Sequence, residues 1–304
     1  MGKPNFFIVG APKCGTTALS QYLQEHKNVF FCTPKEPAFF CKEIKPKCRQ
    51  INTLERYLHC FKNVCHYHTA IGEGSTRYFS CAFAIKSILK FNSQAKFIAM
   101  VRNPIDMFFS LHADHYFTHR EKYSNPEKAW KEADSGNNVR KFFSDKLALN
   151  YKRMCKLGEQ ASRLFDVVPK ENIHVIVYDD FKIDTKKVYI DVLNFLGISY
   201  DGRIDFPKVN IRKYGMNKYI GAIKLFLKNI RSLKTKYAGN VRLPKPFFSY
   251  FINKVEDISN VHARAYKGDV YSEEFIQELK NYFEPDVLRL SKLIDRDLTH
   301  WIYR

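Results

Sequence analysis

The first 24 residues constrain the fold most, because they combine a short apolar run, a glycine-bearing loop and the start of a helix. Residues 5–10 (NFFIVG) predict a buried strand, residues 11–17 (APKCGTT) a loop, and residues 16 or 17 to 24 a helix. Such a loop directs backbone N–H groups at an oxyanion, and the helix dipole favours the same negative charge. Gly15 lets the backbone approach that anion closely, so the segment predicts a phosphate-binding loop.

Beyond this segment, apolar runs alternate with helical patterns along the chain. Further strands are predicted at 68–72, 96–101 and 172–178. Helices are predicted at 53–61, 81–90, 104 to about 115, 145–165, 185–196, 272–283 and 286–294. Because helical crossovers cover both faces of a parallel sheet, the alternation predicts an α/β fold with a central parallel sheet flanked by helices and a P-loop-type nucleotide-binding core.

The charge balance is strongly basic. The chain has 50 Lys and Arg against 31 Asp and Glu, a formal net charge of +19. This excess predicts an anionic partner, which could be a nucleotide, a nucleic acid, an acidic polysaccharide or a membrane surface. A basic but merely solvated surface is the alternative.

Residues 206–255 carry twelve of the Lys and Arg residues and no acidic residue. Within them, apolar residues at helical spacing predict an amphipathic helix. It could be a peripheral helix docked on the core with a solvated basic face, an acceptor-binding lid, or a helix lying on a membrane surface. Since no Gly/Ser/Pro-rich linker divides the sequence, we expect a single domain over 1–304 with a basic helical insertion at about 203–262.

The cysteine pattern argues against disulfides and metals. The eight cysteines form no C-x-x-C pair, which is typical of free thiols in a reducing cytosol. Cys60, Cys65, His66 and His68 are zinc-ligand types at an unfamiliar spacing, so we expect core cysteines and surface histidines and no metal site. The first apolar run, 6–9, is too short for a signal peptide or a membrane anchor, so we expect a cytoplasmic protein.

The phosphate loop departs from the ATP-binding pattern G-x-x-x-x-G-K-[ST]. Gly10 and Gly15 fit that spacing, but threonine follows Gly15, and the lysine stands earlier, at Lys13. A kinase or ATPase needs its lysine on the β- and γ-phosphates and a hydroxyl on Mg²⁺. A lysine inside the loop can instead reach the bridging oxygen of a shorter phosphosulfate. An incidental lysine in a strand–turn–helix segment is the alternative.

A second polar signal follows the predicted strand 96–101. Arg102 lies where this strand ends, which is the usual place for ligand contacts in open α/β sheets. Ser110 lies eight residues further on, about two turns into the next helix. Both could meet one phosphate, for which arginine supplies a planar fork of donors. Alternatively, Arg102 caps the sheet edge and Ser110 is an ordinary helix serine.

Together, these segments resemble the family of sulfotransferases that use 3′-phosphoadenosine-5′-phosphosulfate (PAPS). PKCGTTAL at 12–19 is similar to the family's 5′-phosphosulfate loop, and VRNPIDMFFSLHADHY at 101–116 is similar to its 3′-phosphate segment. GEGSTRYF at 72–79 and the tail at 282–301 resemble the heparan-sulfate-type and bacterial branch. The resemblance implies PAPS as cofactor, adenosine 3′,5′-bisphosphate (PAP) as product, and no metal.

The resemblance also implies roles for individual residues. Lys13 would stabilise the sulfuryl group and the leaving phosphate, while Arg102 and Ser110 would hold the 3′-phosphate. The loop residues that would hold the 5′-phosphosulfate are Lys13, Cys14, Gly15, Thr16 and Thr17.

The general base is implied by TPKEPAFF at 33–40, which has the layout of the heparan-sulfate branch and makes Glu36 the candidate. A surface carboxylate paired with Lys35 is the alternative. The branch that acts on small molecules uses histidine instead, so His115 and His112 are rival candidates, although each could equally be a core or helix-surface histidine.

Two departures from the family pattern stand out. Many heparan-sulfate members have a second lysine after the glutamate of the 72–79 segment, where this chain has Gly74. The family's late Lys-Gly-Arg loop is also imperfect here. Depending on the alignment, Arg264 or Lys267 falls at the start of that loop, and both are cofactor-binding candidates.

The resemblance thus implies in-line transfer of a sulfuryl group from PAPS to a hydroxyl or amine of a carbohydrate or small-molecule (natural product) acceptor. A P-loop kinase is one alternative class, and a non-catalytic polyanion- or nucleic-acid-binding module is another. A nucleic-acid partner is not expected, because no nucleic-acid-binding signature accompanies the charge. The identity of the acceptor and the oligomeric state are not indicated by the sequence.

Overall fold

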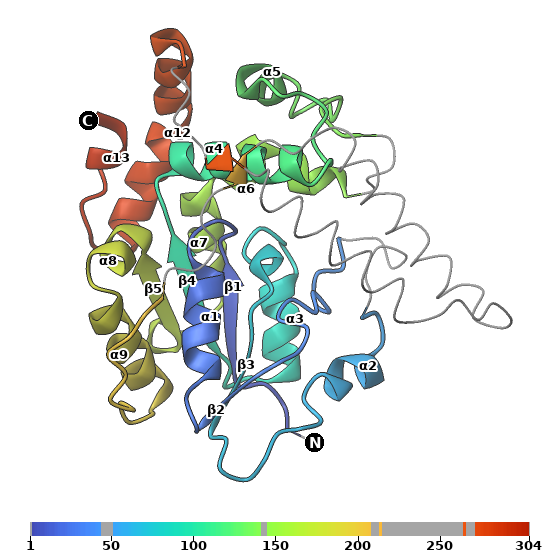
Figure 1. Ribbon diagram of the computed structural model, residues 1–304, viewed down its shortest axis with the longest axis vertical. Coiled ribbons are helices and arrows are strands. Elements are labelled where there is room, and N and C mark those ends of the chain that lie inside the picture. Colours follow the sequence, from blue (N-terminus) through green and yellow to red (C-terminus); the bar gives the residue numbers. More distant parts are fainter. Residues whose placement is uncertain are drawn as a thin grey trace, which may run out of the picture.

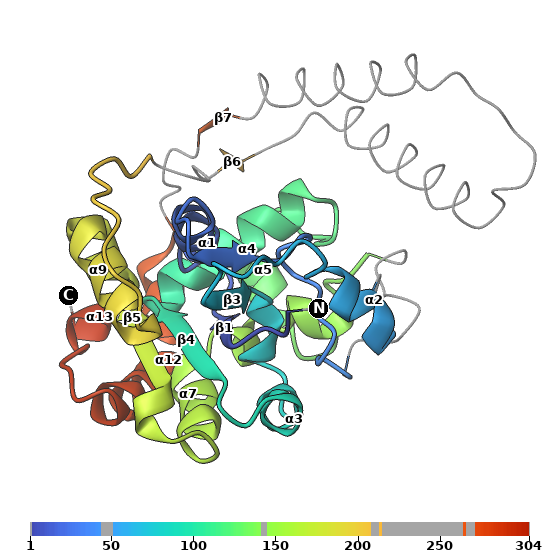
Figure 2. The ribbon, with the colours of Figure 1, turned by 90° about the horizontal axis from the view of Figure 1, so that it is seen from below.

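The computed structural model describes residues 2–43, 51–140, 145–207, 213–214, 264–265 and 271–303. Its centre is a five-stranded parallel sheet with the strand order β2-β3-β1-β4-β5, and helices lie on both faces of this sheet (Figures 1 and 2). The predicted α/β class with a central parallel sheet is therefore confirmed.

The strands are short and mostly buried. They are β1 (Phe6–Gly10), β2 (Val29–Phe31), β3 (Ala70–Glu73), β4 (Lys96–Val101) and β5 (Ile173–Val177). All five residues of β1 are buried, because this strand pairs with β3 on one side and β4 on the other and is covered on both faces. Since all strands run parallel, their carboxyl ends share one edge of the sheet, where open α/β folds bind ligands.

The helices follow the expected alternation with the strands. They are α1 (Thr16–Gln24), α2 (Leu54–His59), α3 (Ala84–Phe91), α4 (Pro104–Phe117), α5 (Pro126–Lys131), α6 (Tyr151–Met154), α7 (Leu157–Phe165), α8 (Tyr178–Ile183), α9 (Thr185–Leu196), α12 (Glu273–Leu293) and α13 (His300–Tyr303). Short 3₁₀ segments are η2 (Thr76–Tyr78), η3 (Lys146–Leu149) and η4 (Lys170–Asn172).

The prediction of one long helix over 145–165 is wrong. The segment is divided into η3, α6 and α7, because side chains compete for its backbone N–H groups. Asn150 accepts a hydrogen bond from the backbone N–H of Arg153 and starts α6. The buried carboxylate of Asp286 accepts hydrogen bonds of 2.7 and 2.8 Å from the N–H groups of Gly158 and Glu159, and so caps α7.

The predicted break between 272–283 and 286–294 is also wrong. Both parts belong to α12, which contains Pro285. Phe283, Val287 and Leu290 continue one buried face across the proline. Burying each such side chain contributes about 1.5–3 kcal/mol, and together they outweigh the roughly 3 kcal/mol that proline costs inside a helix.

The basic segment 206–255 lies almost entirely outside the described residues, so its predicted helix and the boundaries of the insertion stay predictions. Two short strands are described in this region. β6 (Lys213–Tyr214) lies within the segment, β7 (Arg264–Ala265) follows it, and the two pair antiparallel. The single-domain organisation also stays a prediction. Within the described ranges, no helix is both long enough and apolar enough to cross a membrane.

Candidate functional site

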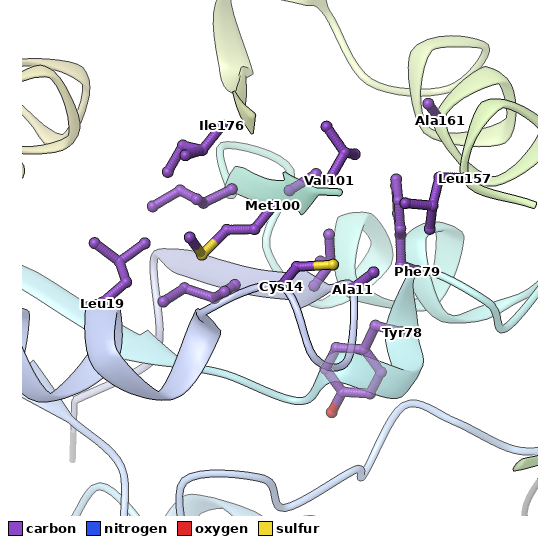
Figure 3. Close-up of a cluster of buried hydrophobic side chains, with 14 of the residues drawn as sticks. Ala11, Cys14, Leu19, Tyr78, Phe79, Met100, Val101, Leu157, Ala161 and Ile176 are labelled. Atoms are coloured by element: carbon purple, nitrogen blue, oxygen red, sulfur yellow. The ribbon is translucent and has the colours of Figure 1, made fainter. Parts of the chain in front are cut away.

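Two side chains of the loop that joins β1 to α1 are buried in the hydrophobic core and fix the loop in place. Ala11 and Cys14 are completely buried and point into the hydrophobic cluster that includes Met100 (Figure 3). Burial raises the pKa of the Cys14 thiol to about 12, so this thiol is an uncharged core group. Cys14 can therefore offer a ligand only its backbone.

The backbone of the loop requires glycine at position 15. Gly15 has φ of 90° and is the N-cap residue of α1. A Cβ atom here would lie 3.1 Å from Cε2 of Tyr178 and 3.2 Å from Cδ1 of Phe181, so the glycine also permits close packing against α8. No side chain caps the first turn of α1, to which buried Thr16 and half-buried Thr17 belong. The N–H groups of this turn are thus suited to an anion.

Lys13 and Arg102 lie together at the carboxyl edge of the sheet, although they are 89 residues apart in sequence. Nη1 of Arg102 donates a hydrogen bond of 3.2 Å to the carbonyl oxygen of Lys13. The guanidinium also stacks over the ring of Tyr178 at 4.8 Å and donates to Asp106 at 3.1 Å. The amine of Lys13 lies 3.3 Å from Oδ1 of Asp114. The structure therefore brings the two principal cofactor candidates into contact.

Ser110 is buried in the second turn of α4, the helix that follows Arg102. It is four residues from Asp114 and therefore on the same face of the helix. The shared grip of Ser110 and Arg102 on one phosphate stays a prediction.

Glu36 is a half-exposed carboxylate with two partners. Its Oε1 atom lies 3.2 Å from Nζ of Lys35, and its Oε2 atom accepts a hydrogen bond of 3.0 Å from Oγ1 of Thr76. The ion pair with Lys35 that the sequence offered as an alternative is thus present. The contact with Thr76 adds a second restraint, which orients the carboxylate toward the segment that follows β3.

The loop around Glu36 is tied along its length to the segment 74–79. The backbone N–H of Ala38 donates to Oγ of Ser75 at 2.9 Å, and the N–H of Phe40 donates to the Tyr78 hydroxyl at 3.3 Å. The segment then joins the central strand, where the N–H of Phe79 donates to the carbonyl of Val9 at 2.9 Å. These bonds connect Glu36 to the end of β1, from which the phosphate loop starts.

Lys35 occupies the space beside Gly74, the position at which the resemblance implies a second lysine. Its amine donates a hydrogen bond of 3.0 Å to the Gly74 carbonyl. A Cβ atom on Gly74 would lie 3.2 Å from Cε and 3.3 Å from Nζ of Lys35. A positive charge is therefore present next to this position despite the glycine. The sequence predicts Lys35 only as an ion-pair partner of Glu36, so its contact with Gly74 is a finding of the structure.

The two histidine candidates are buried side chains of α4. Nε2 of His112 lies 3.0 Å from the carbonyl oxygen of Tyr123. His115 is buried, and its ring lies close to the backbone of Ala148. Burial lowers the pKa of His115 to about 4, so its ring is uncharged at neutral pH. Both positions fit core histidines, and the choice of Glu36 as the general base stays a prediction.

Residues 3–213, which include the whole five-stranded sheet and most of the site, match the model of the sulfotransferase domain family. The chain belongs to this family. It is a sulfotransferase that uses PAPS, so the predicted enzyme class and the use of PAPS are confirmed, while the absence of a metal stays a prediction. This membership favours sulfuryl transfer over the kinase and the nucleic-acid-binding alternatives.

Solved structures support the same fold for this sulfotransferase. The sulfotransferase from Alicyclobacillus acidocaldarius is 24% identical, with a TM-score of 0.71, over 99% of each chain. The mouse sulfotransferase SULT7A1, solved in complex with PAP, is 14% identical, with a TM-score of 0.51, over 97% of this chain and 87% of that one. A search of curated proteins found no match.

The sulfotransferase shows no arrangement of metal ligands within the residues that the structure describes. No three His, Cys, Asp or Glu side chains there lie close enough together to hold an ion. His68 instead accepts a hydrogen bond of 2.9 Å from the N–H of Cys65 through Nδ1. The late-loop candidates are only partly described, since Arg264 contributes backbone to β7 and Lys267 lies outside the described residues.

Glu73 is a buried carboxylate next to the site that the sequence did not single out. It ends β3 and is completely buried, and the hydroxyl groups of Tyr57, Tyr78 and Ser75 lie around its carboxyl group. Burial raises the pKa of Glu73 from its ordinary value of 4.5 to about 8. At neutral pH, the folded enzyme therefore holds a proton here that the unfolded chain releases.

Glu73→Gln should stabilise the fold at alkaline pH. Between pH 4.5 and about 8 the native state binds more protons than the unfolded state at this position, so wild-type stability falls as pH rises. Glutamine removes this titration. We expect a gain in the free energy of unfolding on the order of 3–5 kcal/mol at pH 8 and almost none at pH 4.5.

Urea unfolding from pH 4.5 to 8 measures this difference between Glu73→Gln and the wild type. Glu127→Gln is the matched control, because Glu127 is only half-buried on α5 and pairs with Lys131. The control should stay within about 0.5 kcal/mol of the wild type at every pH. A Glu73→Gln variant that loses stability equally at both ends of the range would contradict the protonated state assigned to Glu73.

Proposed function

We propose that this sulfotransferase transfers the sulfuryl group of PAPS in line to a hydroxyl or amine of a carbohydrate or small-molecule acceptor, with Lys13 on the leaving side and Glu36 as general base. One observation carries the proposal. Lys13, Arg102 and the loop of Glu36 all follow strands that end at the same edge of the sheet, where Arg102 contacts Lys13 and Glu36 contacts Thr76.

The residues at this edge offer hydrogen-bond donors for two phosphate groups, such as the 5′- and 3′-phosphates of PAP. The first turn of α1 and the amine of Lys13 would hold the 5′-phosphosulfate, together with Thr16 and Thr17. Nε of Arg102 is buried without a hydrogen-bond partner among the described residues, so it is a donor suited to a phosphate oxygen. Ser110, with Arg264 or Lys267 from the late loop, would complete the grip on the 3′-phosphate.

The chemistry divides between the two sides of the site. When bound, PAPS supplies a sulfuryl group on a good leaving phosphate. Glu36 accepts the proton of the acceptor O–H or N–H as the bond from that atom to sulfur forms. Lys13 and the loop N–H groups offset the negative charge that develops on the bridging oxygen as its bond to sulfur breaks. Thr76 and Lys35 hold the Glu36 carboxylate in place.

The nucleotide preference tests the proposal directly. PAP or PAPS should raise the melting temperature in the presence of EDTA, while ATP should change it little. Ligand at about 100 times its Kd stabilises the native state by roughly 2.7 kcal/mol. Incubation with PAPS and a library of sugars, phenols, alcohols and amines should then give a product heavier by one sulfate. Equal stabilisation by Mg-ATP, with no sulfated product, would contradict the proposal.

A further inference from the structure

Both the side-chain amine and the backbone carbonyl of Lys13 contact residues outside the phosphate loop. At the side-chain end, Nζ of Lys13 lies 3.3 Å from Oδ1 of Asp114, and the two side chains are 31% and 39% exposed. At the backbone end, the carbonyl oxygen of Lys13 accepts a hydrogen bond from Arg102. Both partners belong to one continuous segment, the end of β4 and the helix α4. The position of this amine is therefore set from outside the phosphate loop.

A carboxylate at this place is electrostatically unexpected. The site binds a polyanionic nucleotide, and a negative charge beside its lysine opposes that binding. Asp106, a second carboxylate next to the cofactor candidates, contacts the guanidinium of Arg102 rather than the lysine amine. We therefore expect Asp114 to contribute something that offsets the lower affinity for the cofactor.

Orientation of the amine supplies such a role. A lysine side chain is long and flexible, so an ammonium group that is free in solution samples many positions. Lys13 also has an unusual backbone conformation, with φ of 63°, which fixes where its side chain starts. An ammonium group has three N–H donors. If one N–H group donates to Asp114, the other two N–H groups can donate to the bridging oxygen and to a sulfuryl oxygen.

We propose that Asp114 is a positioning residue, which orients the Lys13 amine toward the breaking bond and in doing so weakens nucleotide affinity. The inference rests on the function proposed above, since it needs Lys13 to act on the leaving side. It predicts opposite signs for turnover and affinity when the charge of Asp114 is removed. A role in folding alone would not produce this combination.

Asp114→Asn tests the proposal in two assays that need no known acceptor. Release of inorganic sulfate from PAPS, with water as acceptor, should fall about 10- to 100-fold, because a misplaced amine no longer meets the breaking bond. The Kd for PAP, measured by isothermal titration calorimetry, should fall by about 2- to 10-fold, because a negative charge has left the anion site. Asp114→Glu should restore part of the turnover.

A double-mutant cycle separates positioning from a direct role of Asp114. In a Lys13→Ala background, Asp114→Asn should change sulfate release by less than about 2-fold, because the group that Asp114 orients is gone. An equal loss in both backgrounds would overturn the proposal, as would Asp114→Asn with wild-type turnover. Asp191→Asn is the matched control, since Asp191 is 41% exposed and pairs with Lys187 on α9. It should leave both assays unchanged.

The wild-type enzyme separates this inference from the proposed function. If wild-type protein binds PAP and releases sulfate from PAPS but Asp114→Asn behaves identically, only the positioning role fails. If wild-type protein neither binds PAP nor turns over PAPS, the proposed function fails and the role of Asp114 fails with it.

Discussion

Lys13→Ala is expected to lower the turnover of PAPS by about 10²–10³-fold while changing the affinity for PAP by less than about 10-fold. The amine contributes most as charge grows on the bridging oxygen, and PAP lacks the sulfuryl group on the far side of that oxygen. The loss should therefore appear in the chemical step rather than in ground-state binding. Single-turnover release of sulfate and calorimetric titration with PAP measure the two quantities separately.

Arg102→Ala should show the reverse pattern and is the natural comparison. Its guanidinium holds a group that does not react, so its loss should chiefly raise the Kd for PAP. The structure adds a secondary effect, because Arg102 also donates to the Lys13 carbonyl and packs on Tyr178, so some turnover should be lost through the loop. Arg102→Lys keeps the charge without the planar fork and should recover little affinity. If Lys13→Ala abolishes PAP binding while Arg102→Ala only slows turnover, the two roles are exchanged.

Local signals account for the parts of the fold that were predicted well. The strand at 96–101 was found at its observed bounds because a continuous apolar run ends at a charged residue. The helix at 185–196 was also placed correctly. Asp184 caps its first turn, and Gly197 ends it in the left-handed conformation with φ of 76°.

Contacts distant in sequence account for the errors. The break before α7 depends on Asp286, which is 128 residues away from Gly158. The helical pattern at 145–165 does not indicate a contact with Asp286. Conversely, Pro285 predicts a break in α12, but the helix continues through it. It continues because apolar residues on both sides of the proline are buried against the core, which the local sequence does not indicate.

In the candidate site, too, local signals predict some features, while others depend on contacts distant in sequence. Lys13 follows β1 and Arg102 follows β4, and these neighbouring parallel strands end at the same edge of the sheet. The contact between the two residues is therefore predictable from their positions after the strands. The partners of the reactive groups do not follow from position. Asp114 is 101 residues from Lys13, and Thr76 is 40 residues from Glu36. Asp114 stands four residues after Ser110 on one helix face, and this spacing was the signal in the sequence that could have drawn attention to it.

Glu36→Gln is expected to reduce transfer to the acceptor found in the library screen by about 10²–10⁴-fold. Glutamine keeps the size of the side chain and can still accept the hydrogen bond from Thr76, but it cannot take the acceptor proton. The affinity for PAP should stay close to that of the wild type, because Glu36 serves the acceptor rather than the nucleotide. Initial rates at saturating PAPS, together with calorimetry on PAP, check both statements.

Two controls decide whether the loss reflects base catalysis. Glu159→Gln changes a carboxylate of similar exposure on α7, which pairs with Arg163, and should leave turnover unchanged. His115→Asn should retain most activity once its stability is matched by lowering the temperature, because the ring is buried and uncharged. An active Glu36→Gln enzyme beside an inactive but folded His115→Asn enzyme would move the base to α4 and leave the phosphate loop and its lysine in their assigned roles. Loss of PAP binding in Glu36→Gln would instead mean that the loop 35–40, tied to 74–79, supports the nucleotide site.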